Sequence, residues 1–258
     1  MPQAREIKSR IANIKDIKQI TKAMNAIAMA KVTRLKNVIT RARPYQEVMN
    51  SKLRMLVEKS GSDGEGEGGP ISPLLSQSDG ERIGLAVLNS DRGLSGNYTV
   101  DLNRAARDFI RDREEEVALY AGGDKARRFF KKWDQLEKSW VDFYTEPELD
   151  RAEAIGKEML EVFLEGEVCE FWAIYMKFHS DLKQELVVEK ILPLTPPGEE
   201  EMEEVVEEEG ERDRSRSRGA ADYMFDPERE EILSGFLEEW FLERIFWIIL
   251  NTKTSEHA

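Results

Sequence analysis

The sequence predicts an α/β protein in which an open sheet domain carries a long helical arm. Three observations lead to this fold class. Residues 3–59 contain no glycine and one proline, Pro44, and their apolar residues recur at helical spacing. Between residues 83 and 194, apolar runs of strand length alternate with helical segments. Residues 222–258 again have a helical pattern and contain the most apolar stretch of the chain.

Residues 1–60 predict one long amphipathic helix. Its apolar residues lie three or four positions apart, which places most of them on one face: Ile7, Ile11, Ile14, Ile17, Met24, Ile27, Ala28, Val32, Leu35 and Ile39. An uninterrupted helix over residues 3–43 would be about 60 Å long. Because this length exceeds the diameter of a small domain, part of the helix must leave the folded body. Its narrow apolar stripe predicts a coiled-coil partner.

The middle of the chain predicts an open α/β sheet with a hairpin at one end. Residues 61–80 begin as a glycine-rich linker, and residues 81–195 form the sheet domain. Alternating strands and helices are typical of parallel sheets, and a short turn around 179–183 indicates that the last two strands form a hairpin. The expected strands are 83–89, 117–123, 140–144, 169–178 and 184–194, and the expected helices are 99–113, 124–133 and 147–164.

Residues 196–221 interrupt this pattern. Nine glutamates fall within 199–211 and four arginines within 212–218. Charge repulsion and the scarcity of apolar residues predict a solvated, disordered insertion. Residues 222–258 are expected to form a last helix, with Asp226 as its N-cap and Pro227 in its first turn.

Charge is distributed unevenly along the chain. The formal net charge is −13, yet residues 1–60 hold 14 Lys and Arg against 4 Asp and Glu, so the remaining residues are strongly acidic. A basic arm on an acidic body predicts an acidic partner for the arm. The single cysteine, Cys169, excludes an intramolecular disulfide and fits a reducing compartment. The N-terminus lacks a secretory signal, and the apolar stretch 237–250 is too short and too charged to predict a membrane span.

The stretch NSDRGLSGNY (89–98) lies where some α/β enzymes bind phosphate, between a strand and a helix. Its glycines, Gly93 and Gly96, have the spacing G-x-x-G, which matches neither G-x-G-x-x-G nor G-x-x-x-x-G-K-S/T. The second predicted strand ends in ALYAGG, without an acidic residue for a ribose. A tight turn is the favoured interpretation, and a Rossmann-like nucleotide-binding enzyme is an alternative.

The remaining residues predict no catalytic, cofactor-binding or metal-binding site. The basic helix suggests an adaptor or nucleic-acid-binding protein as a further alternative, although residues 1–44 lack interleaved aromatic residues and the acidic body would repel phosphate. Cys169, His179 and His257 are too scattered for a metal site. The aromatic residues of the last helix predict packing: Trp240, Phe241, Phe246 and Trp247.

Two stretches resemble the gamma subunit of rotary ATP synthases, which forms the central stalk of those enzymes. They are REIKSRIANIKDIKQITKAMNAIAMAKVTRLKNVITRARPY (5–45) and LNSDRGLSGN (88–97). A weaker third match comprises YMFDPEREEIL and FLERIFWIILNTKTSEHA within 223–258. The three stretches follow the order of the family.

The resemblance implies a fold, a role and partners. The fold is a Rossmann-like open sheet domain without nucleotide, joined to long N- and C-terminal helices that form an antiparallel coiled coil. The role is that of a rotor without catalytic residues or cofactors, which couples ion flow through a membrane c-ring to conformational cycling of catalytic beta subunits. The partners are the alpha and beta subunits, the epsilon subunit and the c-ring, with no nucleic acid. The residues expected to contact partners are Lys18, Lys22, Met24, Lys31, Arg34, Lys36, Asp91 and Arg92.

The sequence departs from the family pattern in three places. Family members have a C-terminal helix that continues past the S-E-x-A segment, so we expect a C-terminally truncated chain, either a fragment or a short form, whose N-terminal helix lacks part of its partner. The segment 196–221 is an additional acidic insertion, and SGNY (95–98) stands where many members have a small residue or Cys followed by Gly. Because no transit-like leader is visible, the expected location is the cytoplasmic face of a bacterial plasma (inner) membrane.

Overall fold

One five-stranded sheet forms the centre of the protein. The computed structural model describes residues 2–62, 72–76, 78–142, 149–195 and 229–258. The strand order is β3-β2-β1-β4-β5, with parallel pairing except between β4 and β5, which form an antiparallel hairpin. The strands are β1 (Arg82–Leu88), β2 (Val117–Gly122), β3 (Leu136–Trp140), β4 (Val168–Phe178) and β5 (Gln184–Leu192). This architecture confirms the predicted α/β fold class.

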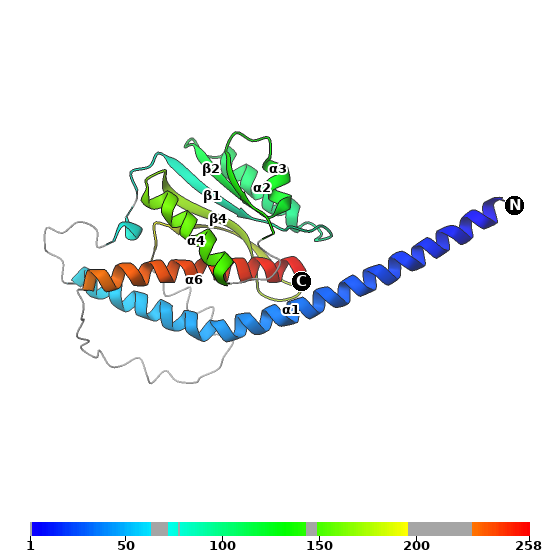
Figure 1. Cartoon of the computed structure of the whole chain (residues 1–258), viewed down its shortest axis with the longest axis horizontal. Helices are drawn as coiled ribbons and strands as arrows, with labels where there is room; N and C mark the ends of the chain where they lie inside the picture. Colours follow the sequence, from blue (N-terminus) through cyan, green and yellow to red (C-terminus); the bar gives the residue numbers. More distant parts are fainter. Residues whose placement is uncertain (1, 63–71, 77, 143–148, 196–228) are drawn as a thin grey trace.

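Helices cover both faces of the sheet. They are α1 (Pro2–Ser62), α2 (Tyr98–Arg111), α3 (Asp124–Phe130), α4 (Leu149–Leu164) and α6 (Arg229–His257), with a short 3-10 helix, η1 (Pro73–Leu75). Figure 1 shows α2 and α3 on one face, α4 and α6 on the other, and α1 alongside α6. The two long helices therefore lie on the same side of the sheet.

Two predicted elements need correction. The third strand is Leu136–Trp140 and not 140–144, because these residues continue the parallel pairing with β2, where Gly122 lies opposite Trp140. Helix α3 ends at Phe130, three residues before the predicted end, and the backbone N–H of Trp133 donates to the Phe130 carbonyl in a turn. Of the predicted linker at 61–80, residues 61–62 belong to α1 and residues 73–75 to η1, whereas 63–71 and 77 lie outside the described residues. The insertion at 196–221 and residues 222–228 also lie outside them.

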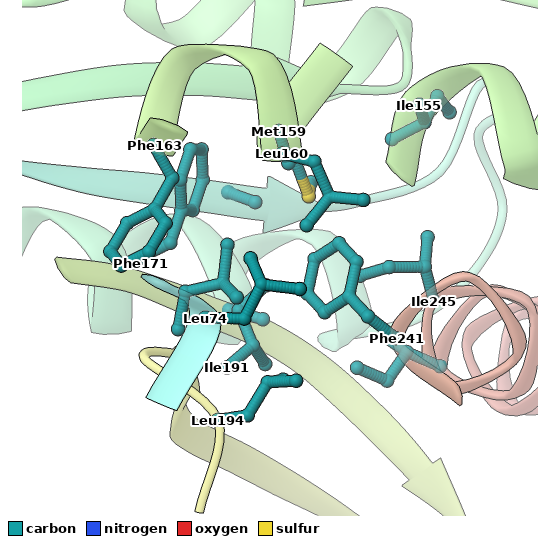
Figure 2. Packing of buried hydrophobic residues seen from close by; sticks show 14 of the residues in the cluster. Leu74, Ile155, Met159, Leu160, Phe163, Phe171, Ile191, Leu194, Phe241 and Ile245 are labelled. Carbon is teal, nitrogen blue, oxygen red and sulfur yellow. The ribbon is translucent and has the colours of Figure 1, made fainter. Parts of the chain in front are cut away.

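Side chains on the two faces of the sheet belong to two separate cores. In β1, Ile83, Leu85 and Val87 pack under α2 and α3, while Ala86 and Leu88 face α4 and α6. This alternation follows from the two-residue repeat of a strand. Figure 2 shows the larger core, in which Leu74 of η1 and Phe241 of α6 meet side chains from α4 and from the sheet.

Helix α6 is buried along most of its length, which explains its large apolar residues. Trp240 and Phe241 are 3% and 0% exposed and belong to the core, as the sequence predicts. Gly156 of α4 allows the close approach of α6, because a Cβ at this position would lie 2.7 Å from the Leu242 side chain. A helix that is covered by a sheet, by α4 and by α1 does not need a polar face.

Helix α1 is a single element of 61 residues that continues through Pro44. At 1.5 Å per residue, its length is about 90 Å. Figure 1 shows that the helix bends and that its N-terminal part extends beyond the rest of the described chain. An internal proline bends a helix because it lacks an N–H group and crowds the preceding turn.

Candidate functional site at the base of the projecting helix

The first half of α1 is exposed on all sides. Every side chain from residue 4 to residue 27 is exposed, including the apolar stripe; Ile14 and Ile17 are 65% and 62% exposed. Exposed apolar surface of this extent marks a binding surface in a folded protein. We call residues 4–29 the projecting half of α1.

The second half of α1 packs against α6. Val32 and Leu53 are 6% and 0% exposed, and the indole Nε1 of Trp240 donates to Asn50 Oδ1 at 2.8 Å. We call residues 32–53 the packed half of α1. The helices run in opposite directions (Figure 1), so the end of α6 lies beside the point where α1 leaves the sheet domain.

In the loop between β1 and α2, residues 89–97, the Asp91 carboxylate forms hydrogen bonds within the protein. Asp91 Oδ1 accepts hydrogen bonds from the backbone N–H groups of Asp124, at 2.9 Å, and Asp142, at 3.3 Å. Gly96 has φ +54°, a left-handed conformation that glycine accommodates without steric cost. These features fit the tight turn favoured by the sequence and fix the loop to the ends of β2 and β3.

The end of α6 lies beside the carboxyl end of β4 and the start of α2, which follows β1. The strand order reverses between these two strands, and open α/β sheets commonly bind ligands at such a point. Here the end of α6 lies at this point. Three hydrogen bonds hold the helix end: Tyr98 OH donates to the Thr252 carbonyl at 3.1 Å, Ser255 Oγ to the Met176 carbonyl at 3.2 Å, and the Phe178 N–H to Asn251 Oδ1 at 3.2 Å.

Charged side chains from three elements act on one another where Lys31 of α1, the loop 89–98 and the α6 end 251–257 come together. We call this place the junction. Lys253 Nζ lies 3.1 Å from Glu256 Oε2, and both side chains are buried. Burial lowers the pKa of Lys253 and raises the pKa of Glu256 because it disfavours the charged form of each group. Burial, followed by the charges of Lys253, Lys31 and Arg92, lowers the pKa of His257 to about 4. Helix α1, the loop and α6 thus each bring a cation to one place, where Lys253 is buried and paired with Glu256 and where Asp91 adds a further negative charge.

The structure brings together some of the residues expected to contact partners. The charges of Lys31 and Asp91 act on the buried Lys253, and the charge of Arg92 acts on Glu256 and His257. Lys36, further along α1, forms an ion pair with Asp181, with Nζ and Oδ1 2.6 Å apart. The other four lie away from the junction on exposed positions of α1: Lys18, Lys22, Met24 and Arg34.

Several residues of the junction were not expected from the sequence. They are Tyr98 and the buried polar residues Asn251, Thr252 and Ser255. The signal in the sequence is the polar run NTKTSE, which directly follows the apolar run FWIIL within one helix. Polar residues on a buried helix end indicate hydrogen bonding to neighbouring backbone.

The described residues offer no apparatus for metal chemistry. Among them, no group of three or more His, Cys, Asp or Glu side chains is placed to hold a metal ion. Cys169 is a free thiol of intermediate exposure in β4. In the same parts of the chain, no helix combines the length and the apolar character needed to cross a membrane.

Comparisons with known proteins agree with this geometry. A family model described as ATP synthase matches residues 3–258. The ATP synthase gamma chain of Pelotomaculum thermopropionicum is 30% identical over 259 residues, which cover 100% of this chain and 84% of that protein. The gamma chain of Moorella thermoacetica is 29% identical, with 100% and 83% coverage.

A solved structure has the same fold. It is described as the central stalk and c-ring of the Tetrahymena thermophila mitochondrial ATP synthase, and the match has a TM-score of 0.65 at 18% identity, covering 92% of this chain and 94% of the other. At this identity the likeness concerns the fold, whereas the family follows from the full-length sequence matches. The chain belongs to the ATP synthase gamma chain family.

Proposed function

We propose that this chain is the rotor subunit in the central stalk of a rotary ATP synthase and has no catalytic residues of its own. One observation carries the proposal: the projecting half of α1 presents an exposed apolar stripe and basic side chains beyond the sheet domain. A helix of this kind binds by inserting into a surrounding protein surface. Membership of the ATP synthase gamma chain family supplies the identity of that surface, the alpha and beta subunits.

In this proposal, the two long helices are the strands of an antiparallel coiled coil, and the sheet domain is a Rossmann-like foot. The opposite directions of α1 and α6 and the Trp240–Asn50 hydrogen bond support the first part. The parallel order β3-β2-β1-β4 supports the second. We divide the chain into a shaft helix (1–60), a linker (61–80), the foot (81–195), an insertion (196–221) and the second shaft helix (222–258).

The proposed mechanism is mechanical. Ion flow turns a membrane c-ring, the c-ring turns the foot, and the asymmetric shaft meets each catalytic beta subunit in turn. Each orientation favours a different conformation of that subunit, so rotation becomes a series of population shifts. Each elementary charge that crosses the membrane supplies about 2.3 kcal/mol per 100 mV, and the shaft must transmit several such increments for each ATP.

The contact residues follow from their positions. Lys18, Lys22, Met24 and Arg34 would meet the alpha and beta subunits along α1. Lys31, Asp91 and Arg92 would meet them at the base of the projecting half. The epsilon subunit and the c-ring would bind the foot, on the cytoplasmic face of a bacterial plasma membrane.

Reconstitution tests the proposal. The purified chain is mixed with alpha and beta subunits from a related bacterial ATP synthase, and the mixture is analysed by size-exclusion chromatography and an ATPase assay. We expect co-elution of all three subunits as a hexamer with a stalk and a higher ATPase rate than that of alpha and beta alone. A folded chain that elutes alone would contradict the proposal. Nucleotide turnover by the isolated chain would favour an enzyme instead.

A further inference from the structure

Helix α1 has two lateral contacts at the place where it leaves the sheet domain. The first is the junction, where Lys31 lies close to the end of α6. The second is the tip of the β4–β5 hairpin, residues 178–185, which we call the hairpin tip. Lys36 Nζ lies 2.6 Å from Asp181 Oδ1 and 5.4 Å from the centre of the Phe178 ring. Along the helix axis, Lys31 and Lys36 are about 7.5 Å apart.

The hairpin tip is closed by hydrogen bonds within its turn and is attached to α6 as well. Its turn is closed by Ser180 Oγ, which accepts hydrogen bonds from the Leu182 and Lys183 N–H groups at 3.3 and 3.0 Å. The Phe178 N–H donates to Asn251 Oδ1 of α6 at 3.2 Å. The hairpin tip therefore connects the sheet to both long helices at one level.

The length of the projecting half explains why an added restraint matters. From residue 3 to Val32, the helix extends about 44 Å. A sideways force at its far end produces a large turning moment at Val32. The packed half, in which Val32 and Leu35 are each 6% exposed, holds the helix against this moment. The Lys36 contacts with the hairpin tip add a restraint close to the point where the helix leaves the sheet domain.

Static stability alone does not explain the Lys36 contacts. The Lys36 and Asp181 side chains are 38% and 59% exposed, and such ion pairs contribute little to the free energy of unfolding. The ammonium group is nevertheless fixed from two directions, by a carboxylate and by an aromatic ring. This arrangement restrains the direction of α1 more than it stabilises the fold.

We propose that Lys36 is a positioning residue for energy coupling, which holds α1 against the hairpin tip through Asp181 and Phe178 so that rotation of the sheet domain reaches the projecting half without tilt. The inference rests on the proposed rotor function. It also gives Lys36 a role within the chain, whereas the sequence suggests a contact with a partner subunit.

The test compares ATP hydrolysis with ion pumping in the complete ATP synthase reconstituted into lipid vesicles. Four variants are compared with the unmodified chain: Lys36→Ala, Asp181→Ala, the exchange Lys36→Asp with Asp181→Lys, and the control Leu182→Ala. Leu182 is 99% exposed at the hairpin tip, so its truncation alters the tip without removing the contact. Lys36→Met, which keeps the apolar stem, serves as a second variant if Lys36→Ala does not fold.

We expect the two single variants to hydrolyse ATP normally but to pump about threefold fewer ions per ATP, because a helix that tilts at its base passes less of its rotation to the sheet domain; the modest size follows from the exposure of the ion pair. The exchange should restore most of the loss, since it rebuilds the ion pair, and Leu182→Ala should pump normally. Unchanged pumping by Lys36→Ala and Lys36→Met would overturn the inference, as would an exchange that restores nothing. If the unmodified chain does not assemble, the rotor proposal itself fails, and this outcome is distinct from the others.

Discussion

The two halves of α1 have the same kind of sequence but opposite environments. Both carry isoleucine, leucine, valine or methionine at helical spacing, interrupted by lysine and arginine. In the projecting half, these apolar residues are exposed, and Ile14 is 65% exposed. In the packed half, several of them are buried (Val32, Leu35, Met49 and Leu53), and Leu53 is fully buried, whereas Val48 is 54% exposed.

The two halves show that the same apolar spacing can serve either internal packing or binding to another protein. Periodicity decides which residues share a face of the helix, but it does not decide whether a partner from the same chain covers that face. The packed half supports the fold, whereas the projecting half is available for other subunits. Substitutions in the two halves should therefore affect different measurements.

The largest difference is expected between Leu53→Ala and Ile17→Ala. Leu53→Ala leaves a cavity in the core and should lower the free energy of unfolding by about 3 kcal/mol. Ile17 is 62% exposed, so its truncation should change stability by less than about 0.5 kcal/mol. Urea unfolding followed by circular dichroism measures both. Equal losses would show that the projecting half is covered in solution and would end the distinction.

A second difference concerns two glycines, Gly123 in the turn before α3 and Gly235 within α6. Gly123 has φ +87°, and a Cβ there would lie 2.4 Å from the Asn89 carbonyl oxygen. Gly123→Ala should therefore lower stability by about 2 kcal/mol. Gly235 of α6 has no atom within 4 Å of such a Cβ, so Gly235→Ala should raise stability by about 0.5–1 kcal/mol. Thermal unfolding distinguishes the two signs, and a stabilising Gly123→Ala would show that the junction loop is not confined.

The hydrogen bond between the long helices should have a smaller effect. Asn50→Ala leaves the Trp240 indole N–H, on a residue only 3% exposed, without its acceptor. The expected loss is about 1–2 kcal/mol. Asn50→Ala combined with Trp240→Phe should lose less than the two single losses together, because the donor is removed as well. Additive losses in urea unfolding would mean that the two side chains do not interact.

The smallest expected effect is a change in the free energy of unfolding with pH, caused by Glu243 of α6. Burial, and then the charge of Glu239, raise the pKa of Glu243 to about 7. A carboxyl group whose pKa is raised in the folded state contributes fully to the free energy of unfolding when the pH is below its ordinary pKa. This contribution is lost as the pH rises through about 7. Since Glu243 is partly exposed, we expect a decline of only about 1 kcal/mol between roughly pH 5 and 8.

The control for the pH effect is Glu243→Gln, measured in the same buffers. His257, whose pKa is lowered to about 4, acts in the opposite direction, because it stabilises fully above its ordinary pKa and this contribution is lost as the pH falls. The difference between the two proteins removes the His257 contribution. Parallel stability curves for the two proteins would mean that Glu243 does not titrate in this range.

Much of the fold could be predicted from sequence because its signals are local. The spacing of apolar residues predicts α1, and short apolar runs predict β1, β2 and β4. The third strand was misplaced because LEKSW (136–140) has weaker strand character than WVDFY (140–144), and pairing with β2 decided the outcome. The end of α3 was set by the turn between Phe130 and Trp133, which the apolar pattern does not reveal.

The candidate site was less accessible to sequence reasoning. The sequence predicts Lys31, Asp91 and Arg92 as contacts, but their electrostatic influence on Lys253, Glu256 and His257 depends on where the end of α6 lies. Asp181 and Asn251 gave no signal, because their partners lie far away in sequence. Contacts of this kind depend on the tertiary arrangement and not on local pattern.

The position of the α6 end has a consequence for how the sheet domain can respond to small molecules. In open sheets of this topology, ligands commonly bind beside the carboxyl ends of the strands, at the point where the strand order reverses. Here Thr252, Ser255 and Asn251 of α6 form hydrogen bonds at that point. Because both partners of each bond belong to the same chain, these contacts do not depend on the concentration of a ligand. A rotor that transmits only its angle needs no ligand-dependent change of shape.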